Sequence, residues 1–372
     1  MSMLDTIPEA IEAIRRGEVI IVVDDEDREN EGDFLIAARH ATPEVVNFMA
    51  THGRGLICAP LIENRCDELG LDLMVQTNNA AFETPFTVSV DLMGHGCTTG
   101  ISAQDRSKTI QALIDPTTDP NELGRPGHIF PLRAKPGGVL RRAGHTEAAI
   151  DFSRLAGFEP AGVIVEIMNE DGTMARLPEC RQLANEHQLK LVSIADLIQY
   201  RLANETLIER TLELNIETAF GTFKAIAFRQ LTNDVEHLAL TLGEWDESED
   251  VPVRVHSSSM LGDVFQMTDF GKGPELHAAL RQIQNQGKGA IVYINKLDEG
   301  RGLIEELKTY QKHQTTPQAA NINTMDSKDY GIGAQIIRNL GIRRLHILSD
   351  HPRKKGIIGY GLEITGTTPL SL

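Results

Sequence analysis

Seven acidic side chains crowd into residues 24–33, near the start of the chain. They follow at once on residues 18–23, a short apolar run rich in β-branched side chains, which predicts a strand buried on both faces. Ligand sites of α/β proteins lie at the ends of such strands. The carboxylates repel one another unless cations offset their charge, and oxygen-rich clusters of this kind suit Mg²⁺ or Mn²⁺. Arg28, inside the run, can hold a phosphate or balance the acids.

A charge run is also typical of a solvated surface turn. The spacing excludes an EF-hand, because Gly32 is out of place for that loop and the twelfth position from Asp25 is Ile36 rather than glutamate. On the residues alone, a metal site, a phosphate site and a solvated turn all stay open.

A glycine-rich segment, residues 137–147, precedes a predicted amphipathic helix. Free backbone N–H groups at a helix start favour anions, and small residues let a phosphate approach. Arg142 adds a charge-assisted contact, and His145 can ligate a metal or transfer a proton. The alternative is a capped turn in which Thr146 is the N-cap residue.

Three more polar positions stand out. His128, in residues 125–132, is either a functional group or a hydrogen-bonded loop histidine. Glu166 ends an otherwise apolar strand, where a charged group is paired, exposed or functional, and burial would make it a candidate base. Residues 98–106 predict a loop entering a helix, with Ser102 and Asp105 in the spacing of a capping box.

The 372 residues favour two domains. The first combines helices and strands and ends near Tyr200; the boundary falls in the charged, helix-prone residues 198–213. The predicted helices are 8–16, 104–114, 147–156, 179–187, 275–286 and 331–340. The predicted strands are 18–23, 162–166, 190–194, 289–294 and 344–348, with 222–230 and 235–242 as a pair.

The composition argues against some classes of partner and predicts the cellular compartment. The formal charge of −17 argues against nucleic acid, which needs clustered Lys and Arg. No apolar run approaches the roughly 20 residues of a membrane span. No secretory h-region precedes the four cysteines, which we expect to be reduced thiols in a cytoplasmic protein.

Five segments, in order, resemble the motifs of 3,4-dihydroxy-2-butanone 4-phosphate synthase and cover about residues 1–200: 24–33, 98–100, 125–133, 144–147 and 171–176. The resemblance implies a homodimer with an α+β fold of mixed α/β layers. It implies conversion of ribulose 5-phosphate to dihydroxybutanone phosphate and formate, a step of riboflavin biosynthesis. The cofactor it implies is Mg²⁺ or Mn²⁺, up to two ions per site.

The same resemblance assigns roles to residues of this chain. By motif, Glu29 and His145 match metal ligands, and His128 and Glu166 match positions essential for catalysis. The matched substrate contacts are Arg28, Glu29, Asp33, Arg142, Ala143, Gly144, His145, Thr146 and Glu166. Removing a proton beside a carbonyl gives an enediolate, whose charge a metal stabilises as a Lewis acid. Each proton transfer needs a positioned acid or base.

Residues 210–372 resemble GTP cyclohydrolase II through segments 253–257, 262–265, 299–302, 329–335 and 352–354. That family holds a catalytic zinc through three cysteines. This part of the chain has none, and Ser259, Phe270 and Lys272 stand at the matching positions. Lys328 replaces an arginine of the family, and the 299–301 element is shifted by two residues.

Serine and phenylalanine do not replace a thiolate ligand, so no zinc is expected there. We therefore predict a synthase domain at 1–202 and a catalytically inactive GTP cyclohydrolase II-like domain at 210–372. The alternatives for the second domain are residual GTP cyclohydrolase II activity, or a regulatory or interaction module.

Overall fold

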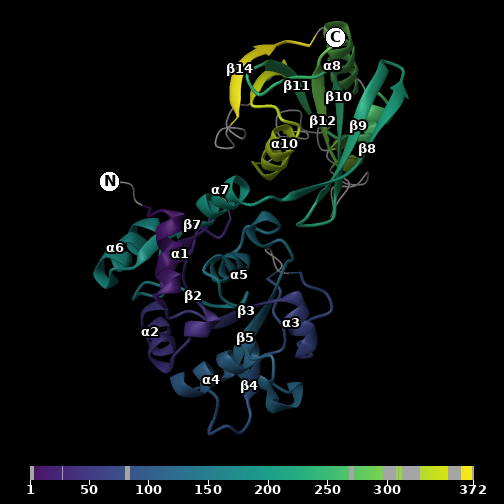
Figure 1. Cartoon of the computed structure of the whole chain (residues 1–372). Helices are drawn as coiled ribbons and strands as arrows, with labels where there is room; N and C mark the ends of the chain where they lie inside the picture. Colours follow the sequence, from purple (N-terminus) through teal and green to yellow (C-terminus); the bar gives the residue numbers. More distant parts are fainter. Residues whose placement is uncertain are drawn as a thin grey trace. The chain divides into compact units, whose positions relative to one another are not determined.

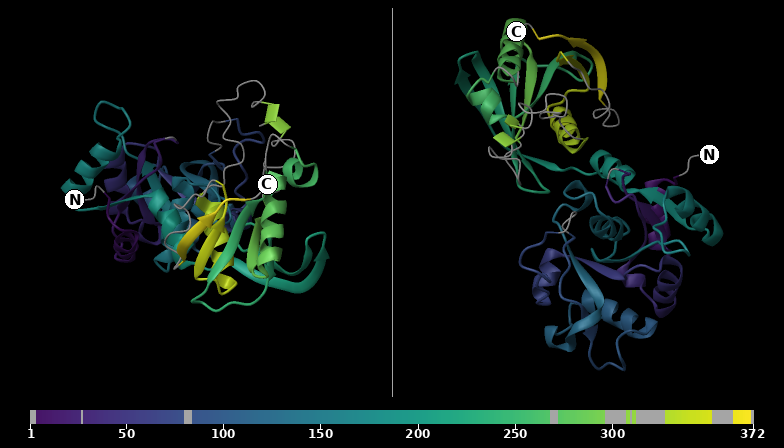
Figure 2. Two further views of the ribbon diagram at one scale, coloured as in Figure 1. Left: turned by 90° about the horizontal axis from the view of Figure 1, so that it is seen from above. Right: turned by 180° about the vertical axis from the view of Figure 1, so that it is seen from behind.

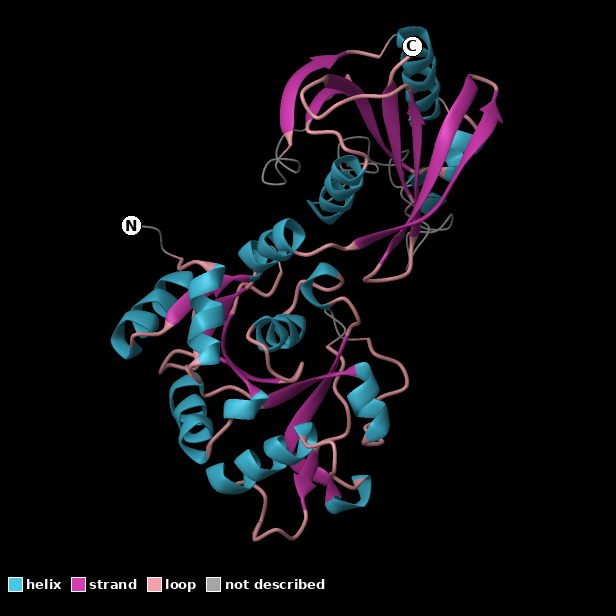
Figure 3. Ribbon diagram, viewed as in Figure 1, coloured by secondary structure: helices cyan, strands magenta, loops and turns pink. Residues whose placement is uncertain are grey.

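The chain forms two compact units, Met1–Arg201 and Leu202–Leu372 (Figure 1). The structure, a computed structural model, describes residues 4–26, 28–79, 84–267, 272–295, 307–308, 310–311, 327–350 and 362–370. Each unit contains one seven-stranded sheet flanked by helices (Figure 3). The predicted mixed α/β class is therefore confirmed.

The first unit has the sheet order β4-β5-β3-β6-β2-β1-β7. Pairs β3–β5 and β1–β7 are parallel and the other neighbours antiparallel. Its strands are β1 (Ile20–Val23), β2 (Gly32–Ala37), β3 (Cys58–Ile62), β4 (Val90–Leu92), β5 (Leu123–Ala134), β6 (Gly162–Glu166) and β7 (Lys190–Ser193). Its helices are α1 (Ile7–Arg15), α2 (Pro43–Gly53), α3 (Glu63–Glu68), α4 (Ala103–Ile114), α5 (His145–Leu155), α6 (Leu177–His187) and α7 (Ile194–Asn204), which runs past the boundary.

Helices α5 and α2 cover opposite faces of this sheet. A Cβ on Gly162 would lie 2.7 Å from the Cβ of Ala149 in α5, whereas a Cβ on Gly53 in α2 would lie 2.8 Å from Cγ1 of Val165. Positions 162 and 165 of one strand face opposite ways because side chains alternate. Glu166 therefore faces the same side as Gly162, toward α5.

The second unit has the sheet order β14-β13-β11-β12-β10-β9-β8. Its elements are β8 (Ile208–Thr218), β9 (Gly221–Gln230), β10 (Glu236–Leu242), β11 (Asp250–Ser257), α8 (Lys272–Gln286), β12 (Gly289–Ile294), α10 (Ser327–Asn339), β13 (Arg344–Leu348) and β14 (Glu363–Thr368). Pairs β12–β11, β11–β13 and β13–β14 are parallel, and the rest are antiparallel (Figure 2). A core cluster that includes Phe223, Ala279 and Ile291 joins this sheet to α8.

Most predicted elements are present, with ends shifted by a few residues. The clear error is residues 198–213, predicted as helix-prone throughout: α7 ends at Asn204 and Ile208 already begins β8. Strand β8 lies at the sheet edge with most side chains exposed, so charged residues occupy it and hide its strand character. Strands β2, β3, β4, β5, β11 and β14 were also not predicted.

Two expectations about the chain's chemistry can be checked directly. All four cysteines are free thiols, and Cys58, Cys66 and Cys180 are buried. Among the described residues, no helix is long and apolar enough to cross a membrane.

Truncating Phe34 tests the packing of α2 on β2. The ring of Phe34 is fully buried and lies 5.3 Å from that of Phe48 in α2, centroid to centroid. We expect Phe34→Ala to lower the free energy of unfolding by about 3–5 kcal/mol, measured by urea titration with circular dichroism. Phe265→Ala, at a ring that is 66% exposed, is the control and should change stability by less than about 0.5 kcal/mol. Equal effects of the two would contradict this packing.

Candidate metal and substrate site

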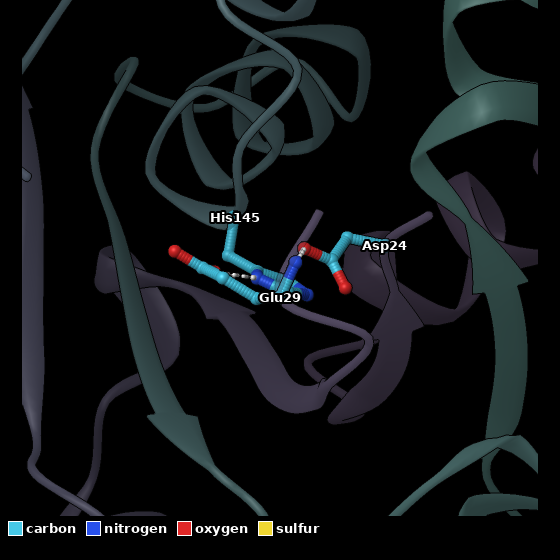
Figure 4. Close-up of side chains that lie close together, drawn as sticks. All are labelled: Asp24, Glu29 and His145. Carbon is cyan, nitrogen blue, oxygen red and sulfur yellow. Dashed lines mark hydrogen bonds and ion pairs between the residues drawn. The ribbon is translucent and has the colours of Figure 1, made fainter. Parts of the chain in front are cut away.

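Three potential metal ligands meet at the end of β1. The ligand atoms of Asp24, Glu29 and His145 all lie within 4.8 Å of one another. Asp24 and Glu29 come from the loop between β1 and β2, and His145 is the first residue of α5. Figure 4 shows the three side chains gathered at one point. The structure thus brings together Glu29 and His145, which are 116 positions apart in the sequence.

Strand pairing adds two carboxylates. Asp33 in β2 and Glu166 in β6 are directly opposite partners in the antiparallel ladder, so both point toward the α5 side. Asp33 is 3% exposed, and its Oδ1 has no hydrogen-bond donor among the described residues. Glu166 accepts a hydrogen bond from the backbone N–H of Leu56 at 2.8 Å, which fixes its carboxylate.

Asp24 and Arg28 shape the acidic loop from within. The carboxylate of Asp24 accepts hydrogen bonds from the N–H groups of Glu29 (3.2 Å) and Glu31 (2.8 Å). It also accepts one from Nη1 of Arg28 at 2.6 Å, and the same nitrogen donates to Glu29 at 2.7 Å. Arg28 therefore balances acids, which is one of the two roles predicted for it. Asp24, Arg28, Glu29 and Glu31 are partly buried, so this part of the loop is not a solvated turn.

Strand β1 fixes the orientation of the His145 ring. Its Nε2–H donates to the carbonyl of Val22 at 3.1 Å. This bond leaves Nδ1 to face Oε2 of Glu29 at 3.9 Å and Oδ1 of Asp33 at 3.8 Å. A backbone acceptor on one ring nitrogen is the usual way in which a protein fixes the ligating nitrogen of a histidine.

Burial and mutual repulsion shift the acid–base properties of the cluster. Burial alone would lower the pKa of His145, but the carboxylates of Asp33, Glu29 and Asp24 raise it to about 9. Burial raises the pKa of Asp33 to about 7, opposed by His145. Burial alone would raise the pKa of Glu29, but His145 and Arg28 lower it below its usual value. A cation would relieve these costs, so the donors present fit a hard divalent ion.

The loop between β5 and α5, residues 135–144, contains the predicted substrate contacts Arg142, Ala143 and Gly144 and is called the substrate loop. Gly144 is the N-cap residue and makes no side-chain cap, so the predicted alternative with Thr146 as N-cap is wrong. Arg142 donates to Oε2 of Glu147 at 2.8 Å, and Glu147 also accepts the N–H of Lys135 at 3.1 Å. A Cβ on Gly144 would lie 2.5 Å from Nη1 of Arg142, so a side chain there would displace the guanidinium. Arg142 and Ala143 are partly exposed, while His145 and Thr146 are buried.

His128 is not part of this cluster. Its backbone N–H and ring Nδ1 bond the two oxygens of Asp91, at 2.8 and 2.6 Å, and its side chain is 44% exposed. Among the described residues it has no hydrogen bond or ion pair to the acidic loop or α5.

Ser102 caps α4 as predicted, but Asp105 accepts from Thr98 and Gly100 instead of closing a capping box.

Two residues of the site, and Asp91, the partner of His128 outside it, were missed by reasoning from the sequence. Asp24 was only one member of a charge run, Glu147 was taken as the start of a helix, and Asp91 was not singled out. The burial of Glu147, which is 0% exposed, is the signal that marks it, and it comes only from the structure.

In the second unit, Ser259 occupies one predicted zinc-ligand position. Its hydroxyl accepts from the N–H of Gly262 at 2.9 Å, and its own N–H donates to Asp263, which also binds His256 and Tyr293. The hydroxyl is thus engaged in a buried turn. The positions outside the described residues are Phe270, 299–302, 352–354 and the side chains of Lys272, Lys328 and Asp329.

Family models match both halves of the chain. The model for 3,4-dihydroxy-2-butanone 4-phosphate synthase matches residues 8–200, and the model for GTP cyclohydrolase II matches residues 209–369. A riboflavin biosynthesis protein RibBA of Cytophaga hutchinsonii is 57% identical over 99% of this chain and 93% of its own. The RibBA of Bacillus subtilis is 52% identical over 100% and 94%.

Solved structures of 3,4-dihydroxy-2-butanone 4-phosphate synthases are also similar to this chain. RibBX of A. baumannii, described as a two-domain 3,4-dihydroxy-2-butanone 4-phosphate synthase, is 40% identical, with a TM-score of 0.79 and coverage of 98% of this chain and 99% of that one. A 3,4-dihydroxy-2-butanone 4-phosphate synthase in complex with two magnesium ions is 44% identical, with a TM-score of 0.51, and covers 53% of this chain and 96% of its own.

The raised pKa of His145 predicts that cation binding releases a proton. Because the pKa is about 9, the metal-free ring is protonated at neutral pH, and a cation competes with that proton for Nδ1. The apparent affinity for Mn²⁺ should rise about tenfold per pH unit up to about pH 9 and then level off.

Calorimetric titration with MnCl₂ in buffers of different ionisation enthalpy measures both the affinity and the released proton. His145→Gln should lose the release and most of the affinity, whereas His95→Gln, at an exposed ring outside the cluster, should keep both. An affinity independent of pH between 6.5 and 8.5 would refute the competition.

Proposed function

Because this chain belongs to the family of riboflavin biosynthesis proteins that begin with a 3,4-dihydroxy-2-butanone 4-phosphate synthase, we infer that its first unit converts D-ribulose 5-phosphate to L-3,4-dihydroxy-2-butanone 4-phosphate and formate. The observation that carries this proposal is the convergence of Glu29, Asp33, Glu166 and His145 beside the N-terminus of α5. On this proposal, general bases, cation ligands and an anion-binding helix end share one site.

The cation is Mg²⁺, with Mn²⁺ as a substitute, held by Glu29 and His145 and flanked by Asp24. A bound divalent ion would supply Lewis-acid stabilisation of negative charge on substrate oxygens. Oxygen donors with one imidazole suit these ions better than softer metals. The related synthase with two magnesium ions supports divalent binding at this site. Two ions per site are consistent with the surplus of carboxylates there.

The substrate's phosphate binds at the substrate loop. Arg142 and the free N–H groups of the first turn of α5 recognise a dianion through charge and aligned backbone dipoles. Ala143, Gly144 and Thr146 are small residues, so they leave room for the phosphate to approach the backbone. Arg28, next to the cluster, helps to hold the substrate against the acidic loop.

Carboxylates perform the proton transfers. Asp33 is buried beside the cluster, and its Oδ1 accepts no hydrogen bond among the described residues, so it is placed to take a proton from a carbon beside the carbonyl and return it. Glu166, held by the N–H of Leu56 on the same face, is the second group placed to do so. The chemistry is that of a lyase: carbon–carbon cleavage follows enolisation and releases formate.

The active form is a homodimer in the cytoplasm. His128 matches a position essential for catalysis, yet within one chain it bonds Asp91 and not the cluster. A second copy offers a way for it to reach a site. The exposed apolar side chains Leu73, Met74 and Val75, each about half exposed, fit burial against that copy.

The second unit has lost GTP cyclohydrolase II activity. Ser259, Phe270 and Lys272 cannot form a thiolate zinc site, and without one no water is activated for ring opening. The related RibBX, described only as a two-domain synthase, supports this view. A regulatory or interaction role is the alternative for this unit, and its ordered sheet agrees with that.

Removing the charge of Glu166 should abolish most turnover. Glu166→Gln keeps the shape but cannot accept a proton, so kcat for ribulose 5-phosphate should fall by about 10²–10⁴. Glu170→Gln changes a carboxylate that is 94% exposed and should leave kcat unchanged. Formate release under saturating Mg²⁺ measures both. A Glu166→Gln enzyme with more than a third of the normal kcat would contradict the role.

A paired assay tests which of the two units is catalytically active. The purified full chain should release formate from ribulose 5-phosphate with Mg²⁺ and none from GTP, and metal analysis should find no stoichiometric zinc. Formate from GTP with one zinc per chain would show that the second unit is active. No product from ribulose 5-phosphate with either Mg²⁺ or Mn²⁺ would overturn the assignment of the first unit.

A further inference from the structure

Two buried carboxylates of α5 hold the substrate loop through hydrogen bonds. Glu147 and Asp151 are four residues apart, one turn of the helix, and therefore share a face. Glu147 bonds Lys135 and Arg142, at the two ends of the loop. Asp151 lies deeper, and neither the metal site nor the predicted substrate contacts use it.

Asp151 fixes the middle of the loop. Its side chain is 3% exposed, and Oδ2 accepts the N–H of Val139 at 2.8 Å. Gly138 has a φ of +63°, and a Cβ there would lie 2.3 Å from Oδ1 of Asp151. The backbone therefore rests directly on the carboxylate. Burial raises the pKa of Asp151 to about 6, opposed by Arg201, so the group is ionised at neutral pH.

Arg201, from α7, completes this arrangement. Its Nη1 donates to Oδ2 of Asp151 at 2.9 Å and to the carbonyl of Gly137 at 2.7 Å. The Arg201 side chain is 5% exposed. One guanidinium nitrogen thus joins the carboxylate and the loop backbone, and it does so out of water, where such bonds are strong and directional.

We propose that Arg201 and Asp151 are positioning residues that hold Gly137–Val139 in place and thereby set where Arg142 and the N-terminus of α5 meet the substrate's phosphate. This rests on the proposed function of the first unit. Neither side chain touches the substrate. Their effect is on the geometry of binding, where a shift of about 1 Å can cost much of a site's efficiency.

Three full-length variants test the positioning role. Arg201→Lys keeps the charge, but its ammonium nitrogen ends one atom short of the position of Nη1, the nitrogen that bonds both partners. The double variant Asp151→Asn with Arg201→Gln removes the pair without leaving a buried charge alone, so it should fold. Arg154→Gln is the matched control, because Arg154 approaches the same carboxylate at 3.7 Å from a side chain that is 43% exposed.

We expect KM for ribulose 5-phosphate to rise about tenfold in the first two variants, with kcat within about threefold of the wild type. Arg154→Gln should keep the wild-type KM. A purely structural role would lower the thermal midpoint and the active fraction at an unchanged KM. Wild-type KM in both Arg201→Lys and the double variant would overturn the proposal, as would an equal rise in Arg154→Gln.

Failure of the proposed function looks different from these results, because the wild-type chain would then show no turnover of ribulose 5-phosphate.

Discussion

Crowded negative charge between β1 and β2 is the constraint on which the site depends. Asp24, Glu29 and Asp33 are folded into a half-buried space with Glu166 opposite, and Arg28 and His145 offset part of this charge. Such an arrangement is costly in water and becomes favourable when cations share the space. The rest of the first unit, from the strand register to the start of α5, brings these groups to one place.

The sheet supplies the precision that the loop alone would lack. Antiparallel pairing of β2 with β6 aligns Asp33 and Glu166, and the carbonyl of Val22 fixes the ring of His145. On the other side of α5's first turn, Glu147 and Asp151 hold the glycine-rich loop by its backbone. Helix α5 thus contributes His145 to the cluster and holds the glycine-rich loop, and it packs closely on the sheet where Gly162 meets Ala149.

The sequence revealed the groups with a strong local signal and missed those defined by distant partners. The acidic run and the segment around His145 were identified because their residue types and spacing are unusual, and Glu166 because a charge ends an apolar strand. The pairing of Asp151 with Arg201 spans 50 positions, and nothing in either neighbourhood predicts it. Strand β8 was misjudged because its exposed edge position lets charged residues occupy it. The homodimer and the zinc-free second unit stay predictions.

The measurement that tests the account most directly is the anomalous scattering of Mn²⁺ in crystals of the full chain. The account predicts a peak within bonding distance, roughly 2.0–2.3 Å, of both the Glu29 carboxylate and Nδ1 of His145. Crystals soaked in excess Mn²⁺ at pH 8 that show no peak at these atoms, or a peak only elsewhere, would contradict the claim that this cluster is built for a divalent cation.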